Sequence, residues 1–413
     1  MRDQRVPYVL GVDVGSTHAA AAVCRLGDGR REAEIALVVP ALLQLTDAGS
    51  FSVGDVDPGG WIARGFLRRV GDEVPFVLGP ETCPAEELTA LMIMWIAGQV
   101  AAQEGEPARH VAVVHPAGWG PYRRNLLHNA LRQVGVDNVT LLPDAIAAAE
   151  NHATRDRVPV GKTLAIYAMG SHAFSCALVR RTPARTFELL TSVDGVDHHT
   201  GADFDDALAA VVRGKLPRDA GEVSAVECAQ AKAALSTHQE VSVRGVTVTQ
   251  SDLADEIRPA VDHSVQTLLR TIGPATPDAV LLVGGAVRTP VIVEAVSDAL
   301  DCRVLAEAAP ETSVVKGAAY AARVLVEGPD SEPEPIQTSV LARTDDAALR
   351  FPVGEIAIDH EITAPPPRPP VDIPPIDLPE RRSVKRVVRG LKPAGIRRSG
   401  SDSDNDYDDE DGR

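Results

Sequence analysis

The chain has 413 residues, of which 44% are hydrophobic and only 4% aromatic, and its mean hydropathy is −0.04. This length predicts about two to three domain-sized units, whose cores are built mainly from Ala, Val and Leu. The formal net charge is −17, and residues 381–413 carry nine Lys or Arg against seven Asp or Glu, so the preceding body is more acidic still. Such a body repels polyanions, and we therefore expect no nucleic-acid binding.

The sequence also bears on the compartment. No apolar run reaches the roughly 20 residues that a membrane-spanning helix requires, and the first residues show no signal-peptide pattern. The five cysteines lie far apart without a CxxC pair, which predicts reduced and mostly buried thiols rather than disulfides or a metal cluster. We therefore expect a cytoplasmic protein.

In chain order, the first elements expected are paired hairpins within residues 7–45. An apolar strand leads into the turn Gly15-Ser16-Thr17, an Ala/Val-rich strand follows, and a turn at 27–29 leads to a strand over 34–45. The rest of the first half is expected as a helix over 85–103, a strand over 111–114, a helix over 121–133, a strand over 139–142 and a helix over 144–152.

The second half repeats this scheme. The expected elements are strands near 163–180 and 186–193, helices near 203–213 and 223–236, a strand over 280–283 and a helix over 290–300. Strands that alternate with helices in this way predict an α/β protein.

A strand-turn-strand phrase occurs twice, 155 residues apart. Gly15 of the first copy aligns with Gly170 of the second, whereas Asp13 aligns with Ala168. The Gly-Ser-Thr turn of the first copy exposes N–H groups and hydroxyls that can cradle phosphates, while Asp13 can hold the water shell of Mg²⁺. The alternative is an ordinary hairpin in which Asp13 only favours the turn.

Several further phrases follow in a fixed order. They are residues 11–17, 111–117, 141–149, 201–205, 231–236 and 283–290, with Gly317-Ala318-Ala319 beyond them. Together they resemble the nucleotide-binding domain of the seventy-kilodalton heat-shock chaperones, the DnaK type, within the actin-like ATPase superfamily. The resemblance covers the chain from about Val9 to about Leu325.

The resemblance implies an α/β actin-like ATPase fold. Two ribonuclease-H-like lobes, over residues 1–160 and 161–326, would flank a nucleotide cleft, and a disordered tail would follow over 327–413. The ligands it implies are ATP or ADP and Mg²⁺.

The resemblance also implies roles for particular residues. Asp13, Arg68 and Asp144 take the catalytic positions, and Asp13 holds Mg²⁺ through water. The nucleotide-binding positions are Gly15, Ser16, Thr17, Gly170, Ser171, Gly201, Lys232, Ser236, Gly284, Gly285 and Arg288.

The second loop departs from the family's DLGGGTFD phrase. Its acids become Ala168 and Ser175, its third glycine becomes His172 and its threonine becomes Ala173. Losing one group that orients water or handles a proton costs about 10²- to 10⁴-fold in rate. We therefore expect nucleotide binding with weak or no hydrolysis. His172 either donates to phosphate or only fills the turn.

Other positions keep two interpretations open. Asp144, where the family has a longer glutamate, either orders a water molecule or caps the following Ala-rich helix. Arg68 either neutralises a phosphate or belongs to an exposed basic face. Arg288 either caps the cleft or lies on the surface, and Ala229 and Ala233 replace contacts that the family makes to the base.

The last part of the chain differs from the family's peptide-binding domain and lid. Eight prolines between Pro365 and Pro379 predict an extended segment. A basic run over 381–398 and an acidic run over 402–411 follow. A short basic amphipathic helix there could contact a protein partner or an anionic membrane. The favoured interpretation is that this run folds back on the acidic end.

Three classes of function remain open from the sequence. The first is a chaperone-related ATPase that hydrolyses slowly. The second is a pseudo-ATPase scaffold whose tail recruits an unknown protein partner. The third is an actin-like cytoskeletal or membrane-associated protein. Fold resemblance alone does not choose among them.

Overall fold

The computed structural model describes residues 6–27, 32–47, 49–54, 59–194, 200–217 and 221–328, and all of these belong to one compact unit. Nearly all of the expected tail and most of the expected turn at 27–29 lie outside the described residues. Among the helices of the described part, none is both long and apolar enough to cross a lipid bilayer.

The first large sheet has the strand order β10-β9-β1-β2-β3. Strand β1 pairs antiparallel with β2 and parallel with β9, and its residues are almost fully buried, as expected for a strand covered on both faces. The strands are β1 (Tyr8–Val14), β2 (His18–Arg25), β3 (Glu34–Pro40), β9 (Val111–His115) and β10 (Val139–Pro143).

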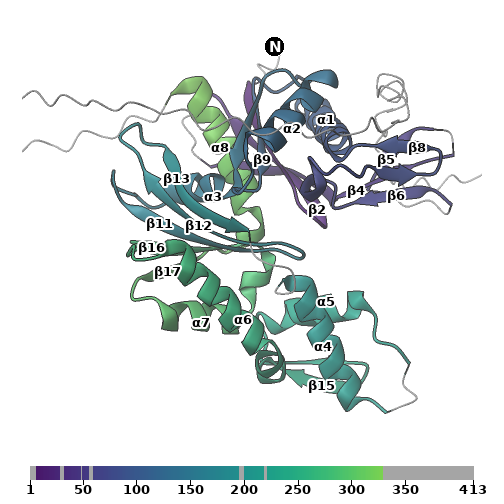
Figure 1. Ribbon diagram of the computed structural model, residues 1–413, viewed down its shortest axis with the longest axis vertical. Helices are drawn as coiled ribbons and strands as arrows, with labels where there is room; N and C mark the ends of the chain where they lie inside the picture. The colour runs from purple at the N-terminus through teal and green to yellow at the C-terminus, as the bar shows by residue number, and fades with distance from the viewer. Residues whose placement is uncertain are drawn as a thin grey trace, which may run out of the picture. The chain divides into compact units, whose positions relative to one another are not determined.

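The second large sheet repeats this topology in the order β13-β12-β11-β16-β17, and Figure 1 shows β11, β12 and β13 side by side. The registers also agree, since Asp13 pairs with Ala20 in the first hairpin and Ala168 pairs with Ser175 in the second. The duplicated phrase therefore forms two equivalent hairpins. The strands are β11 (Thr163–Met169), β12 (Phe174–Arg181), β13 (Phe187–Asp194), β16 (Ala279–Val283) and β17 (Arg303–Ala306).

Helix α3 (Asp144–Ala153) packs against both sheets. Its Ala147 belongs to a cluster with residues of the first sheet and α8 (Ser313–Glu327), while Ala145, Ala148 and Ala149 belong to a cluster with the second sheet. The run of alanines thus gives this helix small apolar surfaces on opposite sides, which allows the helix to lie close to both sheets.

Helix α8 follows the second sheet in the chain but packs on β1, β2 and β9 of the first, beside β9 in Figure 1. Two glycines allow this close packing. A Cβ on Gly11 would lie 2.5 Å from the carbonyl oxygen of Val315, and a Cβ on Gly317 would overlap the carbonyl oxygen of Ala147. The backbone of α8 therefore lies directly on β1 and on α3.

An insertion between β3 and α1 forms two small sheets beside the first large one. The expected strand over 34–45 is wrong as a single element, because it breaks at Ala41 and its second part pairs in a different sheet. The elements are β4 (Leu42–Leu45), β5 (Phe51–Val53), β6 (Trp61–Arg64), η1 (Leu67–Arg69), β7 (Phe76–Leu78) and β8 (Glu81–Cys83), followed by α1 (Ala85–Glu104) and, after β9, α2 (Pro121–Gln133).

The second insertion lies between β13 and β16. It contains α4 (Gly201–Lys215), α5 (Ala225–Leu235), β14 (Glu240–Val243), β15 (Val246–Thr249) and α6 (Gln250–Ile272), and η2 (Gly285–Arg288), α7 (Pro290–Ala299) and η3 (Pro310–Thr312) complete the described elements. Helices α4, α5 and α6 each begin with a capping box, in which a Ser or Thr and an acid three residues later satisfy two otherwise unpaired N–H groups.

The core agrees with the composition. Its buried side chains are mostly Ala, Val and Leu, and the five cysteines are free thiols, four of them buried. Two five-stranded sheets of the same topology, each with its own helices and insertion, make up the α/β actin-like ATPase fold. The expected fold class is confirmed.

Candidate functional site

The two hairpin turns are built in the same way. The N–H of Gly15 donates to the carbonyl oxygen of His18 at 2.9 Å, and the N–H of Gly170 donates to that of Ala173 at 2.8 Å. The two turns therefore share the same closing hydrogen bond.

The second turn is held by neighbouring elements. The first residues of α4 donate to it, from Gly201 N to Gly170 O at 2.9 Å and from Ala202 N to Ser171 O at 2.8 Å. Gly284, after β16, has a φ of +92°, and a Cβ there would overlap the carbonyl oxygen of Met169. Only glycine combines this backbone conformation with this close approach.

A cavity of about 610 Å³ lies between the two turns. Most of the residues that the sequence predicted for the site line it: Asp13, Gly15, Ser16, Thr17, Arg68, Asp144, Gly170, Ser171, Gly201, Lys232, Gly284 and Gly285. The predicted site residues thus come together from both halves of the chain, with Gly15 and Gly170 on one cavity.

Two predicted residues are placed elsewhere. Arg288 does not line this cavity, and its guanidinium pairs with Glu311 at 2.9 Å and donates to the carbonyl oxygen of Ala308 at 2.8 Å. Ser236 lines an adjoining hollow of about 300 Å³ that shares Lys232 with this cavity, and its hydroxyl lies 3.4 Å from the carbonyl oxygen of Lys232. Glu311, the partner of Arg288, does line the larger cavity.

Asp13 and Asp144 are the acids of the cavity that the sequence identified. Burial raises the pKa of Asp13 to about 6. Burial also raises the pKa of Asp144 to about 7, and the negative charges of Asp194 and Asp13 raise it further, against hydrogen bonds from backbone N–H groups. Both carboxyl groups therefore titrate closer to neutral pH than an exposed aspartate does.

The backbone contacts of Asp144 explain its place at the start of α3. Its Oδ1 accepts from Ala145 N at 2.7 Å and from Ala117 N at 3.0 Å, and Pro143 stands at the N-cap position. The helix begins at Asp144 with no side-chain cap, so the alternative in which Asp144 is the N-cap is wrong. The carboxylate instead binds one N–H group at the helix start and one in the loop after β9, and it lines the cavity.

A third acid of the cavity, Asp194, was missed by sequence reasoning. It ends β13 and lines the cavity, and a Cβ on Gly118 would lie 2.7 Å from its Oδ2. Burial raises its pKa, while the positive charges of Arg68 and Arg123 lower it. No local motif marks Asp194, because only the pairing of β13 with β12 brings it to the site.

Two cations of the cavity, Arg68 and Lys232, contact the second half of the site. Arg68 donates to the carbonyl oxygen of His172, across the cavity from its own helical turn η1. Lys232 donates to the carbonyl oxygen of Gly201 and lies 2.7 Å from Asp205 Oδ1. Both side chains therefore support the loop around Gly170, directly or through the start of α4.

His115 and Trp119 were also missed, and both line the cavity. Their rings stack with centroids 5.5 Å apart and an interplanar angle of 14°. His115 is 1% exposed, its Nδ1 lies 2.8 Å from the carbonyl oxygen of Pro116, and burial lowers its pKa. The stacked rings form part of the cavity wall, and the Nε2 of His115 is buried there.

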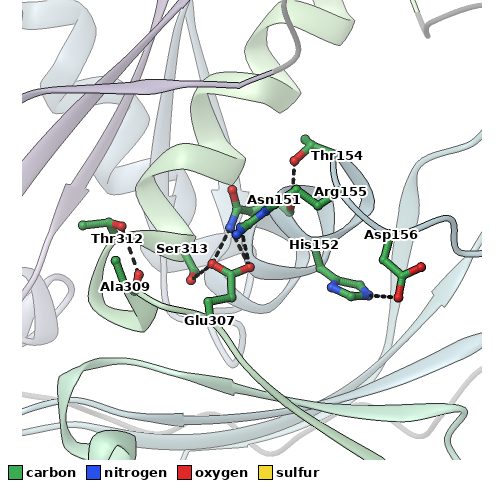
Figure 2. A network of polar contacts seen from close by, with 9 residues as sticks. All are labelled: Asn151, His152, Thr154, Arg155, Asp156, Glu307, Ala309, Thr312 and Ser313. Carbon is green, nitrogen blue, oxygen red and sulfur yellow. Dashed lines mark hydrogen bonds and ion pairs between the residues drawn. The ribbon is translucent and has the colours of Figure 1, made fainter. Parts of the chain in front are cut away.

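A polar cluster fixes the other end of α3. Figure 2 shows the side chains of Asn151, Arg155 and Ser313 directed at the carboxylate of Glu307. Asn151 Nδ2 lies 2.9 Å from each Glu307 oxygen, and Arg155 lies 2.6 Å from Oε1. Glu307 follows β17, so this cluster, here called the Glu307 cluster (Asn151, Arg155, Glu307 and Ser313), joins α3 and α8 to the second sheet.

The acids of the cavity offer carboxylate oxygens as donors for a cation. Among the described residues, no three His, Cys, Asp or Glu side chains are close enough to hold a metal ion together. Five carboxylates nevertheless line the cavity. Those of Asp205 and Glu311 are paired with Lys232 and Arg288, and the other three come from Asp13, Asp144 and Asp194. Oxygen ligands that are too dispersed for direct coordination suit Mg²⁺, which keeps several of its waters.

Comparisons with known proteins agree with this architecture. A family model described as Hsp70 protein matches residues 73–336. The chain is 23% identical to the chaperone protein DnaK of Elusimicrobium minutum, over 77% of this chain and 58% of that protein. It is 26% identical to the HscA homologue of Bordetella petrii, over 76% and 58%, and 27% identical to that of Azotobacter vinelandii, over 78% and 59%.

The chain therefore spans less than two thirds of the length of these chaperones. The family match covers well over half of the chain, and it includes α2, α3, the second sheet and α8. On this match and on the topology of its two sheets, the chain belongs to the Hsp70 family.

Proposed function

We propose that the protein binds ATP or ADP with Mg²⁺ in the cavity and hydrolyses ATP slowly or not at all. The observation that carries this proposal is the cavity itself, which is lined by two equivalent glycine turns from two equivalent sheets. Its volume of about 610 Å³ lies within the range of small-molecule and cofactor sites.

The phosphates would lie between the turns. Ser16 and Thr17 offer N–H groups and hydroxyls from the first turn, and Ser171 offers its N–H group from the second, while Arg68 supplies positive charge. Mg²⁺ would supply the charge that neutralises the phosphates, and Asp13 would hold it through its waters.

The nucleoside would lie toward the end of the cavity where α5 meets the loop after β16. Lys232, Gly284 and Gly285 line this end, and Ala229 lines it without a polar group. Small side chains there leave space for a base but give it few polar partners. We therefore expect weak discrimination among purine bases.

Slow turnover follows from the second turn. Ala168 and Ser175 occupy a paired position next to it and line the cavity, and neither carries a carboxylate. Asp144 remains as an acid that could orient water, but one such group without its usual partner gives a rate lower by about 10²- to 10⁴-fold.

Titration calorimetry with ATP and with ADP in the presence of Mg²⁺, run beside a phosphate-release assay, tests this proposal. We expect heat of binding with both nucleotides and phosphate release far slower than binding. An Asp13→Asn variant is expected to bind Mg·ATP more weakly, while Asp298→Asn, which changes an exposed acid on α7, is the matched control. Absence of heat with both nucleotides would overturn the proposal.

The Hsp70 relationship and the charged end of the chain support a second part of the proposal. We propose that the basic and acidic runs over 381–413 recruit a protein partner, in a cytoplasmic setting that suits the free cysteines. Deletion of 381–413 is expected to abolish co-purification of that partner and to leave nucleotide binding unchanged. Pelleting with anionic vesicles that depends on 381–413 would instead favour a membrane-associated role.

A further inference from the structure

Ala168 stands where the family's second loop has an acid. The second sheet carries another acid, Asp194, in the same row of paired residues across its strands. Ala168 on β11 pairs with Ser175 on β12, and Ser175 pairs with Asp194 on β13. These three residues therefore lie side by side across three neighbouring strands and project toward the same face. In the first sheet the acid of the equivalent row, Asp13, stands on the central strand instead.

The neighbourhood of Asp194 belongs to the first half of the chain. Its carboxylate lies against Gly118, in the loop after β9, where a Cβ would be 2.7 Å from Oδ2 and 3.1 Å from Cγ. A side chain at residue 118 would therefore displace the Asp194 carboxylate from this position. The contact places the carboxylate at the cavity, between elements of both sheets.

Charged groups surround Asp194 from three separate elements. Arg68 of η1 and Arg123 of α2 act on it as positive charges, and Asp194 in turn acts on Asp144 of α3 as a negative one. All four residues line the cavity. Asp194 thus lies near two arginines that could bind phosphate and near Asp144, which could orient a water molecule.

We propose that Asp194 supplies, from β13, the second-sheet carboxylate that orders the water shell of Mg²⁺ bound with the nucleotide, in place of the acid that Ala168 lacks. This inference rests on the proposed nucleotide binding. Asp194 is a positioning residue, because it acts through metal-bound water and forms no bond with the nucleotide.

Calorimetric titration of the full chain with ATP, with Mg²⁺ and with EDTA, tests this role. For the unaltered protein, Mg²⁺ is expected to strengthen ATP binding by about tenfold, the size of one or two charge-assisted hydrogen bonds. Asp194→Asn keeps the shape beside Gly118 and is expected to remove most of this gain. In EDTA the same variant should bind ATP more tightly than the unaltered protein, because a negative charge near the phosphates is gone.

A rescue variant and a control complete the test. Ala168→Asp combined with Asp194→Asn returns a carboxylate to the same row. In this double variant Mg²⁺ is expected to strengthen ATP binding at least threefold. The control Asp298→Asn, which changes an exposed acid on α7, should behave as the unaltered protein.

The failures of the two proposals are distinguishable. If the unaltered protein binds neither nucleotide, the proposed function fails. If it binds Mg·ATP but Asp194→Asn keeps the full Mg²⁺ gain, the role of Asp194 alone is overturned. A loss that Ala168→Asp does not restore also overturns it, because the loss then comes from disturbed packing at Gly118 and not from a missing carboxylate.

Discussion

Asn151 of α3 donates from its Nδ2 to both carboxylate oxygens of Glu307, at 2.9 Å each. The first residue of the same helix, Asp144, lines the cavity. A single short helix thus connects the candidate site to the polar contact between α3, α8 and the segment after β17.

We expect Glu307→Ala to lower the free energy of unfolding by about 1–3 kcal/mol, because it leaves Asn151 and Ser313 without their charged acceptor. Urea denaturation monitored by circular dichroism measures this change. Glu294→Ala, on the exposed face of α7, should change the stability by no more than about 0.5 kcal/mol. Equal effects of the two substitutions would show that the Glu307 cluster does not stabilise the fold.

The raised pKa of Asp144, about 7, predicts a dependence of stability on pH. Between the unfolded value near 4 and the folded value near 7, the folded protein binds more protons than the unfolded chain, so this group makes the protein less stable as pH rises. The slope for one proton is at most about 1.4 kcal/mol per pH unit.

Asp144→Asn keeps an oxygen for the N–H groups of Ala117 and Ala145 and removes the titration. The fall in unfolding free energy from pH 4.5 to 7.5 should therefore become shallower, with the part due to Asp13 remaining. Asp298→Asn should leave the slope as it is. An unchanged slope in Asp144→Asn would mean that Asp144 titrates as an exposed acid does.

Arg68 and Arg69 are adjacent but make different contacts, so we expect one substitution to affect ATP binding and the other to affect thermal stability. Arg68 lines the cavity, whereas Arg69 donates to Val74 O at 2.6 Å and lies 4.2 Å above the ring of Phe76. Arg68→Ala is expected to weaken ATP binding about tenfold, and more than ADP binding, because it removes one phosphate partner. Arg69→Ala should lower thermal stability and leave ATP affinity unchanged. Calorimetry and thermal denaturation of both variants provide the comparison, and the reverse pattern would contradict it.

Two consecutive glycines provide a further pair. Gly284→Ala would strain a left-handed backbone conformation and crowd the carbonyl oxygen of Met169, so we expect a loss of about 1–3 kcal/mol in stability or more. Gly285 has no neighbouring atom within 4 Å of its Cβ position, and Gly285→Ala should fold as the unaltered protein does. Thermal unfolding of both variants tests this, and similar midpoints would show that the approach to Met169 does not require glycine.

Much of the fold follows from local sequence. The hairpins of β1 with β2 and β11 with β12 were predicted because apolar runs flank turn residues at matching spacing. Helix α6 was missed because Pro259 interrupts its pattern, although the capping box of Thr249 and Asp252 marks its start in the sequence. The break at Ala41 was not predictable from local sequence, because it depends on the pairing of β4 with β6, which comes later in the chain.

The site was predictable where a motif carries it and not elsewhere. The glycine turns mark the two walls of the cavity, and Asp144 follows a strand at the start of a helix. Asp194 ends a strand of ordinary composition and reaches the cavity only through long-range pairing. Arg288 matches a motif, but it pairs with Glu311 and does not itself line the cavity.

The contacts of α8 at Gly11 and Gly317 have a mechanical consequence. At both points backbone meets backbone, with no long side chain between the two segments. A shift of α8 along its axis therefore reaches β1, which carries Asp13, and α3, which begins at Asp144, without being absorbed by a change of rotamer. The two acids that come from the first half of the chain would move together, driven by one helix.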